Sequence, residues 1–256
     1  MYIKLALIRK TRLIRGELKM PEEICKIRTL RIIGLTPEGI KRALGGDIGQ
    51  SDSLKLNLVP HPDGTIDLEI KASAKVERMA QALLSAAEKE VRQKLQDNIY
   101  GINDERLEEV VGYLLYLRRL TVSVAESCTG GLFSNRMTDI PGSSLYYRGG
   151  IVAYDKDIKT NLLNIPAELI EKCGIVSQEI ATSMAKGIAL LMKTDIGIGI
   201  TGYAGPEGDD IGLVYIGLYS KENLNVLEFR FSGEREEIKE KAVYAALDMI
   251  RRGLLK

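Results

Sequence analysis

Hydroxylic residues beside paired glycines form the first segment of this sequence that could do chemistry. Residues 125–131 (AESCTGG) lie between a predicted strand and a predicted helix and contain adjacent nucleophiles, Ser127 and Cys128. Paired glycines allow backbone N–H groups to approach an anion where a helix begins. The alternative is a turn that needs glycine only for its positive φ angles. The segment alone leaves both interpretations open.

Three further polar segments come later in the chain, and each has an ordinary structural alternative. Pro141-Gly142-Ser143-Ser144 is typical of a polar turn. Tyr154 and Lys159 follow a predicted strand, where a lysine whose pKa is lowered could act as a base, or where a charged loop could face solvent. Residues 201–208 (TGYAGPEG) follow the apolar strand IGIGI but match neither the P-loop nor the dinucleotide fingerprint. Their succession at strand ends of one domain favours a shared site.

Histidine and cysteine content limits the chemistry. The single histidine, His61, lies far from these segments, so we expect no Ser-His-Asp triad and look for a lysine, tyrosine or carboxylate base. The three cysteines, at positions 25, 128 and 173, form no CxxC pair, which fits a reducing compartment without a disulfide framework. Because ligands for zinc are scarce, we expect neither a metal nor a cofactor.

An alternation of strands and helices positions these segments in the second half of the chain. Asn98 to Asn103 is interpreted as a hinge, and Asp104 as the N-cap of the next helix. Strands are predicted at 121–125, 150–154, 195–200 and 213–219, and helices at 132–138, 180–192 (capped by Ser177) and 234–252 (ended by Gly253). The pattern predicts an α/β domain of three layers, a central sheet flanked by helices, with ligands at the carboxyl ends of strands.

The first half of the chain has the pattern of a small α+β unit. A short helix at 37–44 precedes alternating strands at 54–58 and 66–70, which are joined by a turn at 60–64 and predicted to form an antiparallel hairpin. His61 is interpreted as a turn residue. A helix at 76–95 is expected to cover the hairpin with a stripe formed by Met79, Leu83, Ala87 and Val91.

The charge distribution and hydropathy of the sequence indicate which partners and which compartment to expect. Residues 1–103 carry 18 Lys and Arg against 13 Asp and Glu, whereas residues 104–256 carry 18 against 22. The basic excess, partly from Lys4, Arg9, Lys10, Arg12 and Arg15, is interpreted as solvated surface, so we do not expect a nucleic-acid partner. The sequence has no run of eighteen apolar residues and no secretory leader, so we expect a cytoplasmic protein without a membrane partner. We also expect a homo-oligomer.

Six motifs in one order resemble the CinA (competence-damage-inducible) family. They are AESCTGG, PGSS, Tyr-x-x-x-x-Lys after a strand, GIVS before a helix, TGxAGP and FSGER. The stretch from about residue 104 to 254 is similar to the C-terminal domain of that family, whose stand-alone members are nicotinamide-nucleotide amidohydrolases. Residues 29–101 resemble, less specifically, its KH-like middle domain. The resemblance divides the chain into a KH-like α+β domain at 1–101 and an amidohydrolase-like α/β domain at 104–256.

The resemblance implies hydrolysis of the carboxamide of nicotinamide mononucleotide to nicotinate mononucleotide and ammonia. It implies Ser127 as the nucleophile, with Tyr154 and Lys159 handling its proton. Substrate contacts are expected at the glycine loops, the PGSS turn and the FSGER motif, namely at Thr129, Gly130, Gly131, Ser143, Ser144, Thr201, Gly202, Gly205 and Arg235.

Departures from the family pattern leave other functions open. Asp155-Lys156 stands where Ser-Asn is usual, Tyr203 replaces isoleucine, and Asp209 replaces a glycine, so the substrate is less firmly implied than the chemistry. One alternative is a nucleotide sensor without turnover. Another is a nucleic-acid-binding protein acting through the KH-like half, although residues 46–49 (GDIG) place an acid inside the expected GxxG loop.

Overall fold

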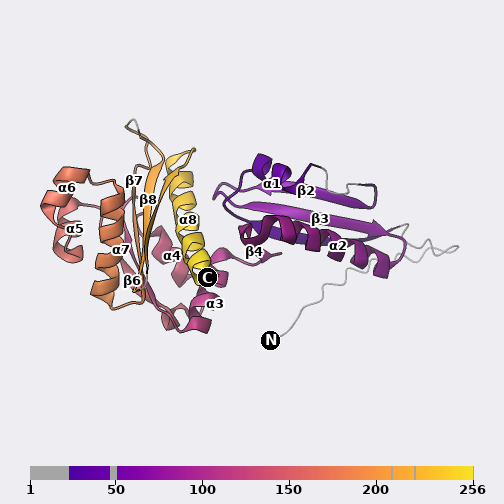
Figure 1. The fold of residues 1–256 in the computed structure, drawn as a ribbon, viewed down its shortest axis with the longest axis horizontal. Coiled ribbons are helices and arrows are strands. Elements are labelled where there is room, and N and C mark those ends of the chain that lie inside the picture. The colour runs from indigo at the N-terminus through magenta and orange to yellow at the C-terminus, as the bar shows by residue number, and fades with distance from the viewer. Residues whose placement is uncertain (1–22, 47–50, 209, 222, 256) are drawn as a thin grey trace, which may run out of the picture.

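The computed structural model describes residues 23–46, 51–208, 210–221 and 223–255, arranged as two α/β units joined near residue 103 (Figure 1). The basic cluster between Lys4 and Arg15, residues 47–49 of the GDIG segment, and Asp209 lie outside the described residues. Within the described part of the chain, no helix is both long and apolar enough to cross a membrane.

The N-terminal unit is the expected small α+β domain, with one antiparallel sheet in the order β2-β3-β1-β4. Its elements are β1 (Ile24–Ile32), α1 (Pro37–Leu44), β2 (Leu54–Pro60), β3 (Ile66–Ala74), α2 (Glu77–Leu95), the 3₁₀ turn η1 (Gln96–Asn98) and β4 (Ile99–Ile102). The predicted helix at 37–44 and the hairpin are confirmed. The predicted hinge is wrong, because residues 99–102 form a strand that pairs with β1 and hydrogen-bonds the backbone groups along its edge.

The apolar stripe of α2 differs from the prediction. Met79 and Leu83 are 60% and 38% exposed, whereas the buried face consists of Ala80, Leu84, Ala87, Val91 and Leu95. A constant spacing of four residues drifts around a helix of 3.6 residues per turn, whereas a spacing of three among the fours brings the residues back to one face. The sheet therefore packs against the face of α2 that carries the buried residues.

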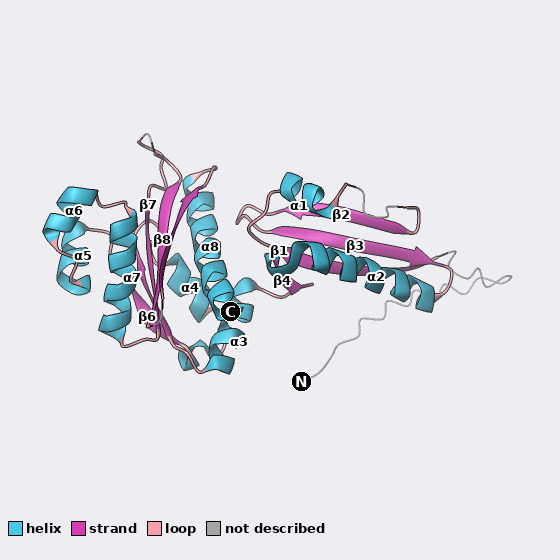
Figure 2. Ribbon diagram, viewed as in Figure 1, coloured by secondary structure: helices cyan, strands magenta, loops and turns pink. Residues whose placement is uncertain are grey.

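The C-terminal unit is the expected three-layer α/β domain. Its elements are α3 (Leu107–Arg118), β5 (Val122–Glu126), α4 (Leu132–Thr138), η2 (Ser143–Leu145), β6 (Tyr147–Val152), α5 (Lys156–Leu163), α6 (Ala167–Cys173), α7 (Gln178–Met192), β7 (Ile196–Gly202), β8 (Leu213–Ser220), β9 (Leu224–Arg230) and α8 (Arg235–Leu255). The sheet order is β6-β5-β7-β8-β9. Helices α3, α4 and α8 cover one face and α5, α6 and α7 the other (Figures 1 and 2).

Some element boundaries differ from the sequence-based ones. Helix α3 starts after Arg106 rather than Asp104, and α8 continues through Gly253 to Leu255. Strand β6 ends at Val152, so Tyr154 lies beyond it. The sequence analysis did not predict β9, α5 or α6. Strand β9 lies at the sheet edge and is largely exposed, which removes the alternation by which strands are recognised.

Glycines in the central strands allow α7 to pack directly on the sheet. A Cβ at Gly197 or Gly199 would overlap the carbonyl oxygens of Ala185 and Ala181, and one at Gly217 would also overlap that of Ala181. The IGIGI strand therefore has its glycines on the face toward α7 because a helix approaches there more closely than any side chain permits.

Parallel pairing brings three loops to one edge of the sheet. Glu126, the last residue of β5, lies opposite Val152 of β6 and Ile200 of β7, and all three strands run in the same direction. The loops that follow these strands therefore meet at their common carboxyl edge. A ligand site is expected at such an edge.

Candidate active site

Ser127 follows directly after β5 at this carboxyl edge. Its backbone N–H donates to the carbonyl of Ile200 at 2.9 Å, which anchors the loop to β7. The residue is 8% exposed. The hydroxyl of Ser127 accepts a hydrogen bond from Nζ of Lys159 at 3.2 Å. The sequence placed these two residues 32 positions apart, and the fold brings them into contact.

Lys159 is fully buried one turn into α5. That helix begins where it does because the Asp155 carboxylate caps it, accepting from the N–H of Asp157 at 2.7 Å. Asp155, a departure from the family pattern, thus has a local structural role. The Lys159 ammonium also donates to the carbonyls of Ala153 and Tyr154.

Burial lowers the pKa of Lys159 from 10.5 to about 8, although nearby Cys128 and Asp155 act in the opposite direction. As a neutral amine, Lys159 can still donate its two N–H groups to the Ala153 and Tyr154 carbonyls. Its lone pair is then directed at the remaining neighbour, the hydroxyl of Ser127. This arrangement can remove a proton from Ser127 near neutral pH.

Tyr154 contributes its backbone to the site. Its carbonyl accepts from Lys159 at 3.2 Å, whereas its side chain is 63% exposed. The strand ends at Val152, and the chain turns outward before α5 begins at Lys156. The structure therefore brings Ser127 and Lys159 together and leaves the Tyr154 ring at the surface.

Glu126 organises the loop of the candidate site, a role that sequence reasoning missed. Its fully buried carboxylate accepts hydrogen bonds from the backbone N–H groups of Gly131, Phe133 and Ser134 and from the Ser134 hydroxyl, at 2.7 to 3.1 Å. This carboxylate satisfies the free N–H groups at the start of α4. An acidic residue shortly before a helix is the sequence signal that could have identified it.

The remaining N–H groups of the loop determine where an oxyanion can be held. Gly130 donates to the carbonyl of Ser127, and Leu132 donates to that of Thr129. Among the described residues, the N–H groups of Cys128 and Thr129 have no backbone carbonyl or side-chain acceptor from another residue. These two N–H groups directly follow Ser127, the predicted nucleophile, and form the candidate oxyanion hole.

Cys128 is unsuited to be the nucleophile. Its side chain is buried in the apolar cluster between the sheet and α8, and that burial raises the pKa of the thiol to about 11. A thiol with so high a pKa stays protonated near neutral pH, and the thiolate is the reactive form. Thr129, beside it, is also fully buried.

The predicted contacts after β7 lie on the same edge. The Thr201 hydroxyl donates to the carbonyl of Ile175 at 2.9 Å, so this side chain holds the GIVS segment in place. Gly202 has no room for a side chain beside Leu213 and Val214. Arg235 of α8 donates to the carbonyl of Gly205. Thr201, Gly202 and Gly205 thus shape the loop, and Arg235 provides a cation at its margin.

The PGSS turn, predicted to contact the substrate, lies away from Ser127 within one chain. Ser143 and Ser144 precede β6, and β6 runs parallel to β5 with Tyr147 opposite Val122. The turn therefore lies at the amino edge of the sheet, a full strand length away from Ser127. The sequence order of the motifs did not reveal which end of the strand each one occupies.

Two family models match this chain. The model described as the CinA C-terminal domain matches residues 104–254, and the one described as the KH domain of the damage-inducible protein CinA matches residues 27–101. Together they cover most of the described residues.

Curated relatives and solved structures agree with these matches. A CinA-like protein of Dictyoglomus thermophilum is 47% identical over 197 residues, which are 75% of this chain and 48% of that protein. A competence-damage inducible protein of Moorella thermoacetica is 41% identical over 236 residues, which are 91% of this chain and 56% of that protein. The chain thus spans about half the length of the curated relatives it matches.

Two crystal structures resemble part of this chain. A CinA-superfamily protein of Klebsiella pneumoniae is 29% identical with a TM-score of 0.57, and the match covers 59% of this chain and 99% of that one. A competence/damage inducible protein of Agrobacterium tumefaciens is 33% identical with a TM-score of 0.56, and the match covers 59% and 94% of the two chains.

Proposed function

This chain belongs to the CinA family, and from that premise we propose that it is an amidohydrolase that converts nicotinamide mononucleotide to nicotinate mononucleotide and ammonia. The observation that carries the proposal is the buried contact between Lys159 and Ser127, in which the lysine has a pKa near the working range of a general base. The expected substrate comes from the family resemblance.

Acylation begins when neutral Lys159 accepts the proton of Ser127. The serine oxygen then attacks the carboxamide carbon, and the N–H groups of Cys128 and Thr129 stabilise the oxyanion. Collapse of the intermediate breaks the C–N bond, and the Lys159 ammonium protonates the departing amine, which leaves as ammonia. The product of this step is an ester between Ser127 and the nicotinoyl carbon.

Deacylation repeats the same proton transfers with water. Lys159 deprotonates a water molecule that attacks the ester, the oxyanion hole is used again, and the ammonium returns its proton to Ser127 as nicotinate mononucleotide leaves. Because one buried base serves both halves, Lys159 alone handles the proton in this scheme. The exposed ring of Tyr154 is then available for contact with the substrate instead.

Ammonia release from a panel of amides tests the proposal. The panel contains nicotinamide mononucleotide, nicotinamide riboside, nicotinamide and glutamine, each assayed with the full chain and with Ser127→Ala. Ammonia from the mononucleotide, lost in the variant, is the expected result. A folded chain that binds the mononucleotide but releases no ammonia from any amide would instead support a nucleotide sensor.

A further inference from the structure

Two cations at the start of α8 face the loops of the candidate active site. Arg235 is the first residue of the helix and Lys239 lies one turn later, so their side chains share one face. Arg235 contacts the carbonyl of Gly205 in the loop after β7. A Cβ placed on Gly130, in the loop after β5, would lie 3.8 Å from Nζ of Lys239. Arg235 therefore lies beside the loop after β7, and Lys239 lies beside the loop after β5.

Neither cation has an ion-pair partner among the described residues. Neighbouring cations are paired instead. Nη2 of Arg136 donates to both carboxylate oxygens of Glu240, and Lys241 donates to the carbonyl of Ser232. The charge of Arg235 also acts on the buried Cys128, where it opposes the larger pKa-raising effect of burial. The positive charge is thus directed at the nucleophile loop and is not neutralised by a carboxylate of the described chain.

The loop itself cannot bind an anion at the start of α4. Glu126 already occupies the N–H groups of Gly131, Phe133 and Ser134 with its own negative charge. A second anion at that helix end would meet a buried carboxylate. Binding of an anionic substrate group therefore depends on side-chain cations rather than on the glycine loop.

We propose that Arg235 and Lys239 together bind the phosphate monoester of the substrate, so that the site accepts a nucleotide and discriminates against the corresponding nucleoside. This inference rests on the proposed function for the identity of the reacting amide. Lys239 is the new residue, since no motif in the sequence indicated it. Both side chains approach from the same helix, which fixes their separation and suits one anion bound by two cations.

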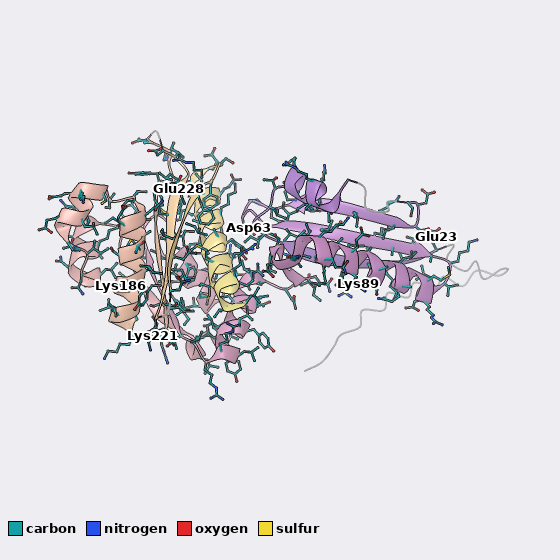
Figure 3. The ribbon with its side chains drawn as sticks, viewed as in Figure 1. Glu23, Asp63, Lys89, Lys186, Lys221 and Glu228 are labelled. Carbon is teal, nitrogen blue, oxygen red and sulfur yellow. The ribbon has the colours of Figure 1, made fainter. Side chains whose placement is uncertain are left out.

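Binding of ribose 5-phosphate tests the anion site without any catalysis. The full chain, Lys239→Met, Lys239→Arg and the control Lys186→Met are titrated with ribose 5-phosphate by calorimetry. Lys186 is an exposed lysine of α7, on the opposite face of the sheet from α8 (Figure 3). Lys239→Met should weaken binding about 10- to 100-fold, as expected for a lost charge-assisted contact, whereas Lys239→Arg and Lys186→Met should retain it. Absence of binding to the full chain, or unchanged binding by Lys239→Met, would overturn the proposal.

Kinetics on two substrates that differ only by the phosphate complete the test. Lys239→Met should lower kcat/KM for nicotinamide mononucleotide about 10- to 100-fold through KM, and leave the value for nicotinamide riboside unchanged. An equal loss on both substrates would refute the phosphate contact while the amidase activity stands. No ammonia from either substrate would refute the proposed function, and the ribose 5-phosphate titration would still decide on the anion site.

Discussion

The pH dependence of turnover tests the assignment of Lys159 as the base most directly. The amine must be neutral to accept the proton of Ser127, and its pKa is about 8. The neutral fraction is then about one half at pH 8 and about one tenth at pH 7. We therefore expect kcat/KM to rise about eightfold from pH 6.5 to 7.5 and to level off above pH 9, because kcat/KM reports the free enzyme.

The assay is ammonia release at subsaturating nicotinamide mononucleotide between pH 6.5 and 9.5. The second ionisation of a phosphate monoester has a pKa of about 6, so the substrate is mostly dianionic across this range. Initial rates for Lys159→Met provide the background at each pH. A profile that is flat between pH 6.5 and 8, or that falls as the pH rises, would refute the assignment.

The same pKa predicts a change in stability that needs no substrate. The folded pKa of Lys159 lies below its ordinary value of 10.5, so the unfolded chain binds more protons between about pH 8 and 10.5. Stability should rise with pH across that window, and the burial penalty is fully present below it. The free energy of unfolding should rise by about 3 kcal/mol across this window.

Urea unfolding of the full chain and of Lys159→Met at pH 7 and pH 10.5 measures this effect. Other groups titrate equally in both proteins, so the difference between them isolates Lys159. We expect that difference to shift by about 3 kcal/mol in favour of the lysine at the higher pH. No shift would mean that the buried amine keeps its ordinary pKa.

Three further predictions concern the remaining residues of the site. Ser127→Ala should lower turnover about a thousandfold or more, whereas Cys128→Ala should stay within about tenfold; an inactive Cys128→Ala beside an active Ser127→Ala would reverse the choice of nucleophile. Tyr154→Phe should keep turnover within about tenfold because its hydroxyl is not needed for proton transfer. A loss of turnover comparable to that of Lys159→Met would show that the tyrosine hydroxyl takes part in catalysis. Turnover should survive dialysis against EDTA, since the described residues hold no cluster of three His, Cys, Asp or Glu side chains; activity restored only by a divalent metal would contradict the scheme.

The two halves of the chain share apolar packing, which the sequence did not indicate. Ile33 and Tyr100 of the KH-like domain are buried in the apolar cluster between the C-terminal sheet and α8. Arg251 of α8 donates to the carbonyl of Asp97. The sequence located the change of pattern near residue 103, but packing between the two units depends on side chains that are far apart in the chain.

The sequence by itself determined the elements with strong periodicity and the chemistry available to them. Alternating apolar residues predicted the hairpin, and the apolar strands with their helices predicted the three-layer domain. A single histidine argued against a histidine-based triad, and the family resemblance carried by the motifs implied Ser127 as nucleophile with Tyr154 and Lys159 handling its proton. These features are local in the chain, so they can be read without the fold.

Only the tertiary structure decided which side chains meet. Parallel pairing of β6 with β5 separates Ser143 from Ser127, and the turn after Val152 directs Tyr154 to the surface. The fold also buries Glu126 beneath the start of α4 and brings Lys239 of the last helix beside Gly130. The direction of a strand and the face that a helix presents are set by packing between distant segments, and no local pattern records them.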